Sequence, residues 1–127
     1  NFTVVKIIGN GRGCAGIGFG RGKSFQMAAK KAEHLAKTNM VYLPRYLNHT
    51  ISCSLYGRYH RLFCVIEPKP FGYGERGPPV IKAICHAFGV RDYLARMYRK
   101  NRFRKCRQGP KFIYIRAIWR AFLRATN

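Results

Sequence analysis

The sequence predicts an α+β fold made of two consecutive small units, and three observations carry this prediction. Short runs of alternating or β-branched residues stand near the start of each half, and apolar residues at helical spacing follow each pair of runs. The 127 residues, 47% of them hydrophobic, are enough for one domain or for two small ones that share a surface. We place the first unit at residues 1–46 and the second at residues 47–127.

The first unit opens with two predicted strands joined by a tight turn. Residues 2–8 are rich in β-branched side chains, and the Asn10-Gly11 pair after them is the strongest short-range signal for a hairpin. In the run at 14–20 the alternate positions 16, 18 and 20 are glycine, so one face of that strand is largely bare while the other carries apolar side chains. A bare face lets a helix or another backbone come very close.

A helix is predicted over residues 25–39, with Ser24 as its N-cap. Its apolar positions at helical spacing are Met27, Ala28, Ala32, Leu35, Ala36 and Met40. Lys30, Lys31 and Lys37 lie mostly off that stripe. Residues 44–49 look like a connector into the second unit.

The second unit opens with two alternating runs, at 50–56 and 60–67, and we predict a tight turn at Gly57-Arg58 between them. In the first run we expect Ile51, Cys53 and Leu55 to face inward and Thr50, Ser52 and Ser54 to face outward. Residues 68–79 form a loop rich in proline and glycine.

Two helices are predicted in the rest of the chain. Pro79 suits the first position of one, which would bury Ile81, Ile84 and Phe88 and end at Gly89. A last helix follows Gly109-Pro110 and carries one apolar stripe made of Phe112, Ile115, Trp119, Phe122 and Leu123, and one basic stripe made of Arg116, Arg120 and Arg124. Periodicity leaves residues 90–98 open between a strand and a short helix.

Positive charge dominates the composition. Lys and Arg number 25 against four Asp and Glu, which gives a formal net charge of +21. Such a charge repels itself unless anions screen it, and the abundant polyanion in cells is nucleic acid. Arginine outnumbers lysine 15 to 10, which favours bidentate phosphate contacts and stacking on bases.

The few acidic residues limit the kinds of enzyme that this chain can be. Glu33, Glu67, Glu75 and Asp92 are scattered, whereas two-metal nucleases, kinases and glycosidases need several carboxylates together. We therefore expect no catalysis by these routes. No apolar run approaches the ~18 residues of a transmembrane helix, and no signal or transit segment is present, so we expect no membrane partner. Because the chain starts at Asn1 within a strand-like run, we expect that a leader or an N-terminal region is missing.

The cysteines are Cys14, Cys53, Cys64, Cys85 and Cys106, and they form no C-x-x-C pair. Their odd count and wide spacing argue against a disulfide framework and indicate a reducing compartment. The four histidines also lack metal-ligand spacing with them. Buried or incidental thiols are the simpler interpretation, a zinc site assembled across the fold is the alternative, and we expect no cofactor.

Two nucleotide-binding patterns appear in the glycine-rich segment, and neither has the right context. Residues 11–16 match G-x-G-x-x-G, but a dinucleotide-binding turn should open into a helix, and a strand is predicted instead. Gly22-Lys23-Ser24 ends like a P-loop, but Ile17 stands where that motif needs glycine. What remains is a Gly/Arg turn near a helix start, where backbone N–H groups and basic side chains suit phosphate. The alternative is that the glycines only permit tight packing.

Residues 99–107 hold six basic residues in nine with no acid among them, which favours contact with nucleic acid over a solvated loop. Tyr46, Tyr56, Tyr59 and Tyr73 lie in predicted turns or loops where they could stack on bases, although each alone is more often a packing residue.

The glycine-rich segment resembles the small-subunit ribosomal protein S-five family. The resemblance runs without gaps from about residue 7 to residue 40 and includes the I-G-N-G-R-G-C-A-G-I-G-F-G-R-G-K run that ends at Lys23. In the second half, Pro68 with Gly72-Tyr73-Gly74, and Lys82-Ala83-Ile84 with Gly89-Val90, are similar to the family's C-terminal pattern.

The resemblance implies a double-stranded-RNA-binding-like unit, β-β-β-α in the family, followed by a ββαβα unit with a left-handed crossover. This sequence departs from the family in two places, because the first strand is missing, which leaves a β-β-α unit, and a basic insertion stands at about 99–109. It also implies that residues 92–99 form a strand. Proteins of this family bind small-subunit rRNA near the central pseudoknot, touch the S-four and S-eight proteins, lie where mRNA enters, and influence decoding accuracy. They are not enzymes and form no homo-oligomers.

On this basis the sequence predicts a structural constituent of the small ribosomal subunit. The RNA-binding residues we expect are Arg12, Arg21, Lys23, Lys30, Lys31, Lys37, Arg58, Arg76, Arg99, Lys100, Arg102, Arg104, Lys105 and Arg107. The alternatives are a free-standing RNA-binding or RNA-processing factor and, from Gly22-Lys23-Ser24 alone, a nucleotide-dependent enzyme. Divergence from the family pattern and enrichment in arginine and aromatic residues favour a mitochondrial member in the matrix, the alternatives being a bacterial cytoplasm or a plastid stroma.

Overall fold

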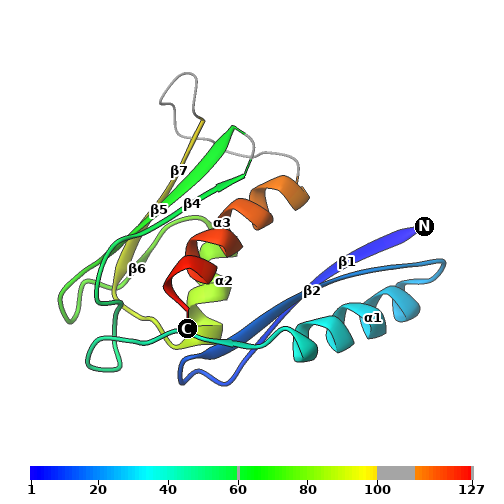
Figure 1. Cartoon of the computed structure of the whole chain (residues 1–127), viewed down its shortest axis with the longest axis horizontal. Helices are drawn as coiled ribbons and strands as arrows, with labels where there is room; N and C mark the ends of the chain where they lie inside the picture. Colours follow the sequence, from blue (N-terminus) through cyan, green and yellow to red (C-terminus); the bar gives the residue numbers. More distant parts are fainter. Residues whose placement is uncertain (60, 100–110, 127) are drawn as a thin grey trace.

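The computed structural model describes residues 1–59, 61–99 and 111–126. Its elements, in chain order, are β1 (Phe2–Gly9), β2 (Cys14–Gly22), α1 (Phe25–Thr38), β3 (Val41–Tyr42), β4 (Leu55–Tyr59), β5 (Leu62–Pro68), β6 (Glu75–Arg76), α2 (Pro79–Phe88), β7 (Tyr93–Arg99) and α3 (Lys111–Ala125). The strands form two sheets, with the orders β1-β2-β3 and β4-β5-β7-β6. Figure 1 shows α2 and α3 between the two sheets and α1 on the outer side of the N-terminal sheet. The predicted α+β class is confirmed.

The predicted hairpin forms at Asn10. Its side-chain oxygen accepts hydrogen bonds from the backbone N–H groups of Arg12 (2.7 Å) and Cys14 (3.1 Å), which closes the turn. Gly11 and Gly13 take positive φ angles of 71° and 105°, so the turn requires residues without a Cβ penalty. β1 and β2 then pair antiparallel along their whole length.

The bare face of β2 lies directly against α1. A Cβ added at Gly18 would stand 2.0 Å from the carbonyl oxygen of Ala32, and one at Gly20 would stand 2.0 Å from that of Ala28. The glycines therefore serve close packing. The buried stripe of α1 is correspondingly narrow and consists of Ala28, Ala32 and Ala36.

Three residues that we expected on that stripe are exposed. Met27, Leu35 and Met40 have large side chains that do not fit where the two backbones come this close, so they lie at the edges of the contact. The predicted N-cap is confirmed, because Ser24 Oγ accepts a hydrogen bond from the N–H of Met27 (3.3 Å).

A third strand, which we did not predict, completes the first sheet. β3 is two residues long and pairs antiparallel with Cys14 and Ala15 of β2. So short a strand leaves no periodic signal in the sequence, and its position depends on where the chain returns after α1.

The predicted turn at Gly57-Arg58 is wrong. Both residues lie inside β4, and the hairpin closes after Tyr59, which pairs with Leu62. Gly57 is needed there for another reason, because a Cβ at this position would stand 2.3 Å from the backbone nitrogen of Ala121 in α3. Glycine thus permits a close strand–helix contact where the sequence favoured a turn.

The predicted strand at 50–56 is also displaced, because β4 begins only at Leu55. Thr50 is buried and Cys53 is exposed, opposite to the expected alternation, whereas Ile51 and Leu55 are buried as expected. Thr50 is buried because its hydroxyl makes a long-range contact, donating a hydrogen bond to the backbone oxygen of Asp92.

The segment 90–98, which periodicity left open, contains β7 and so confirms the strand that the resemblance implied. β7 pairs antiparallel with β5 and parallel with the short β6, with α2 as the crossover between β6 and β7. The handedness of that crossover stays a prediction. The predicted α2 is confirmed from Pro79 to its end, where Gly89 adopts φ 85°.

A single hydrophobic core connects the two sheets. Phe88 of α2 stacks on Trp119 and Phe122 of α3, with ring centroids 5.8 Å and 5.2 Å apart. The same cluster includes Ala15 and Ile17 of β2, so the two units share one core. Leu123 was expected in the apolar stripe of α3 but is exposed, and the Phe112 side chain lies outside the described residues.

The β1–β2 turn is fastened to the end of α2 by backbone hydrogen bonds. Gly11 N–H donates to the carbonyl of Ala87 (2.9 Å), and Gly13 N–H donates to that of Phe88 (2.7 Å). Arg45 adds a hydrogen bond from Nη1 to the carbonyl of Gly89 (3.2 Å).

Within the described residues, no helix is long and apolar enough to cross a membrane.

Candidate nucleic-acid interface

The basic residues of the glycine-rich unit lie at two separate places. Arg21 and Lys23 are exposed and flank the N-terminus of α1, where helix N–H groups favour an anion. Arg12 is exposed in the β1–β2 turn at the opposite end of the nine-residue β2. At about 3.3 Å a residue, that strand separates them by roughly 25–30 Å. The expectation that the Gly/Arg turn and the helix start form one phosphate site is therefore wrong.

The lysines of α1 differ in how much positive charge they offer. Lys30, Lys31 and Lys37 are all exposed. Glu33 takes up part of that charge, since it pairs with Lys37 (3.1 Å) and with Lys6 of β1 (3.4 Å). The hydrogen bond from Lys37, followed by its charge and that of Lys6, lowers the pKa of the Glu33 carboxyl. Lys30 and Lys31 form no ion pair within the described part of the chain, so they offer the freer charge.

The remaining expected residues lie in or after the second sheet. Arg58 is exposed on β4, and its carbonyl accepts a hydrogen bond from Arg120 Nη1 (3.3 Å). Arg76 is exposed on β6, and its guanidinium stands 4.8 Å from the centre of the Tyr73 ring. Arg99 ends β7, whereas Lys100, Arg102, Arg104, Lys105 and Arg107 lie outside the described residues.

Two further arginines reach across the fold onto aromatic rings. Arg116 of α3 lies 4.8 Å from the ring centre of Phe19, and Arg120 lies 4.6 Å from that of Tyr59. The first contact joins α3 to the N-terminal sheet and the second joins it to β4. Cation–π pairs of this kind contribute roughly 0.5–1 kcal/mol each at exposed sites. The basic stripe of α3 thus stabilises the fold as well as adding positive charge.

A buried side-chain hydrogen bond, which sequence reasoning missed, holds the connector to the second sheet. His49 Nδ1 lies 2.8 Å from Asp92 Oδ2, and the other carboxylate oxygen accepts a hydrogen bond from the N–H of Gly74 (3.0 Å). The Gly74 N–H foremost, and then His49, hold the pKa of the Asp92 carboxyl below its usual range. Phe71 stacks on the His49 ring with centroids 3.5 Å apart. Nothing in the sequence pairs residues 43 positions apart, so only the fold reveals this contact.

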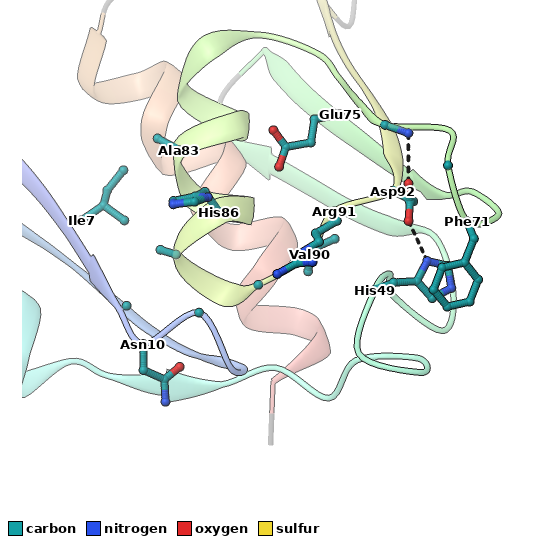
Figure 2. A pocket seen from close by; sticks show the side chains of 16 residues that line it. Ile7, Asn10, His49, Phe71, Glu75, Ala83, His86, Val90, Arg91 and Asp92 are labelled. Carbon is teal, nitrogen blue, oxygen red and sulfur yellow. Dashed lines mark hydrogen bonds and ion pairs between the residues drawn. The ribbon is translucent and has the colours of Figure 1, made fainter.

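An open groove of about 1000 Å³ lies beside this contact, between the β1–β2 turn, α2 and the loop before β6. Figure 2 shows His49, Asp92 and Phe71 at one end of it and Ile7 and Asn10 on the opposite side. Within the described residues, no three His, Cys, Asp or Glu side chains gather closely enough to hold a metal ion. The groove is lined by residues from the β1–β2 turn and from α2 with the segments that flank it.

Comparison with known proteins decides the family. Residues 1–44 match the model of the ribosomal protein S5 N-terminal domain, and residues 57–104 match that of the S5 C-terminal domain. The chain belongs to the ribosomal protein S5 family.

Individual S5 relatives are similar over most of this chain. The small ribosomal subunit protein uS5m of Schizosaccharomyces pombe is 34% identical over 89 residues, which cover 70% of this chain and 23% of that protein. The uS5 protein of Rhodopirellula baltica is 29% identical over 101 residues, 80% of this chain and 56% of its own length. The uS5m protein of Bos taurus is 33% identical over 94 residues, 74% of this chain and 22% of its own. The chain therefore spans only part of the relatives it matches.

Proposed function

We propose that this S5-family chain is a non-catalytic structural constituent of the small ribosomal subunit and that it binds rRNA through phosphate and shape contacts. The match to both S5 domains carries the proposal. The exposed cations support it, because they offer charge on surfaces that the hydrophobic core leaves free. The residues proposed to contact RNA are the basic residues that the sequence predicts to bind it. Arg12 would contact the RNA at a different place from Arg21 and Lys23.

The finer parts of the proposal come from the family resemblance. The protein would lie near the central pseudoknot of the rRNA, beside the S-four and S-eight proteins and where mRNA enters, and would support decoding accuracy. Residues 1–46 would form the double-stranded-RNA-binding-like unit and residues 47–127 the second unit. Relatives named uS5m in Schizosaccharomyces pombe and Bos taurus support a place in the mitochondrial ribosome, in the matrix.

Fractionation on a sucrose gradient tests the proposal. The tagged chain is expressed in cells, and the lysate is separated at low salt and again after a high-salt wash. We expect one copy in each small subunit, retained through the wash. Absence from the small subunit at low salt contradicts the proposal, and loss of the chain on washing favours a free-standing RNA-binding factor instead.

A further inference from the structure

The C-terminal sheet has one face that is not covered by a helix in the described part of the chain. Both α2 and α3 lie on its other side (Figure 1). Burial alternates along the strands accordingly, with Leu62, Cys64 and Ile66 of β5 turned toward the helices. The opposite face, here called the outer face, is formed by Tyr56, Arg58, Phe63, Val65, Glu67, Leu94, Arg96 and Tyr98.

Aromatic and arginine side chains stand next to one another on the outer face. The pairing of β4, β5 and β7 places Arg58, Phe63 and Tyr98 in one row across the strands. The neighbouring row holds Tyr56 and Arg96, on either side of Val65. Each of these two rows therefore carries at least one aromatic ring and one guanidinium group. The two rows stand about 7 Å apart, because they are two residues apart along each strand.

The rings on this face have defined orientations, and Tyr56 is exposed whereas Phe63 and Tyr98 are half-buried. Phe63 stacks on Tyr98 with centroids 5.2 Å apart and an interplanar angle of 26°. Arg96 Nη1 donates a hydrogen bond to the hydroxyl of Tyr98 (3.3 Å), which holds the guanidinium beside the ring. Tyr56 is 57% exposed, a large fraction for a tyrosine in the middle of a strand.

The charge of the outer face is positive. Arg58 and Arg96 are exposed, and the acid on this face, Glu67, is paired with Lys69 (3.6 Å). At the edge of the face, Lys69 and Arg76 stand 5.3 Å and 4.8 Å from the centre of the Tyr73 ring. A partner that fits must bring negative charge and flat rings to the same surface.

We propose that the outer face binds single-stranded RNA by stacking unpaired bases on Tyr56 and Tyr98, with phosphates at Arg58 and Arg96. Unpaired nucleotides supply both a flat ring and an anion at each step, whereas a duplex keeps its bases stacked inside. An apolar protein surface would leave the arginines unpaired on burial. The inference deepens the proposed function, since it assigns unpaired RNA to the second unit.

Binding of the 127-residue chain to three probes tests this: a ten-nucleotide oligoadenylate, the same ribose-phosphate strand without bases, and a ten-base-pair RNA duplex. The double variant Tyr56→Leu/Tyr98→Leu removes both rings and keeps every charge. We expect its affinity for oligoadenylate to fall by at least the roughly 5- to 150-fold that the loss of one stacked base costs, and its affinity for the other two probes to stay within about twofold.

Matched variants control for folding and for position. Tyr56→Phe/Tyr98→Phe keeps the rings and should bind oligoadenylate like the parent chain. Tyr42→Leu removes a tyrosine of similar exposure (49%) from β3 and should also bind like the parent. The proposal is overturned if the parent binds the base-free strand as tightly as oligoadenylate, if Tyr42→Leu loses as much affinity as the double variant, or if the Phe variant is as weak as the Leu variant. Failure of the parent to bind the duplex counts against the proposed rRNA contacts instead.

Discussion

The imidazole Nδ1 of His49 lies 2.8 Å from the carboxylate of Asp92, and both side chains are more than nine-tenths buried. The contact ties the connector between the two units to the start of β7. A buried charge is tolerated only when its hydrogen bonds are made, and Gly74 N–H provides a further one here. The Asp92 carboxylate thus adds to the backbone hydrogen bonds that the N–H groups of Arg91 and Asp92 donate to the carbonyl of His49 (2.8 and 3.0 Å).

Acid should weaken the contact between His49 and Asp92. Because the pKa of Asp92 is lowered in the fold, the unfolded chain binds more protons, so stability rises with pH through this group. Its contribution is complete above the unfolded pKa of about 3.9 and is lost as pH falls through the lower folded value. Urea unfolding between pH 6 and pH 2 measures it.

Asp92→Ala is the matching variant. It leaves Gly74 N–H and His49 without their partner, so we expect a loss of about 1–3 kcal/mol at pH 6 and a shallower fall of stability in acid. Glu33→Ala is the control, since its carboxyl is partly exposed and its change should be much smaller. Identical acid profiles for Asp92→Ala and the parent would contradict this role.

Gly18→Ala should be more destabilising than Gly72→Ala. A Cβ at Gly18 would meet the backbone of Ala32 at 2.0 Å, so α1 and β2 must separate, at a cost of about 3 kcal/mol. Gly72 has φ 87° but nothing within 4 Å, so alanine there costs only about 1–2 kcal/mol of backbone strain. Chemical denaturation compares the two; equal losses would mean that the β2–α1 contact is looser than described.

Lys30 and Lys31 should matter more for RNA binding than Lys37. Each lysine on a phosphate contributes about one to the slope of log K against log salt concentration. Lys30→Gln/Lys31→Gln should therefore lower that slope by about 2, while Lys37→Gln lowers it by less than 1, because Glu33 already neutralises part of its charge. Filter binding to an rRNA fragment at several salt concentrations checks this, and an equal change per lysine would rule out the role of Glu33.

Thiol labelling should follow burial. Burial raises the pKa of Cys64 to about 12 and that of Cys85 well above its ordinary value, so both stay protonated at pH 8. Cys53 is exposed. We expect maleimide to label Cys53 within minutes and to label Cys64 and Cys85 only after unfolding in urea, as read by mass spectrometry of the peptides. Early labelling of Cys64 would show that the C-terminal sheet opens in the native state.

Elements with strong local signals were predictable. Ser24, Asn10 and Gly89 each act through groups a few residues away, so their cap and turn roles follow from residue type and position. The family was also predictable, because the glycine-rich run is long and specific. The composition predicted a positively charged surface, but the fold places the basic residues at separate positions on that surface.

The sequence by itself determined the α+β class, the hairpin, the three helices, the positive charge and the family. Only the tertiary structure decided that Gly57 sits in a strand under α3, that Arg12 and Arg21 lie at opposite ends of β2, and that His49 meets Asp92. The reason is the range of the interactions. Caps and turns are set by neighbours in the chain, whereas close packing and buried side-chain hydrogen bonds depend on residues brought together from far along it.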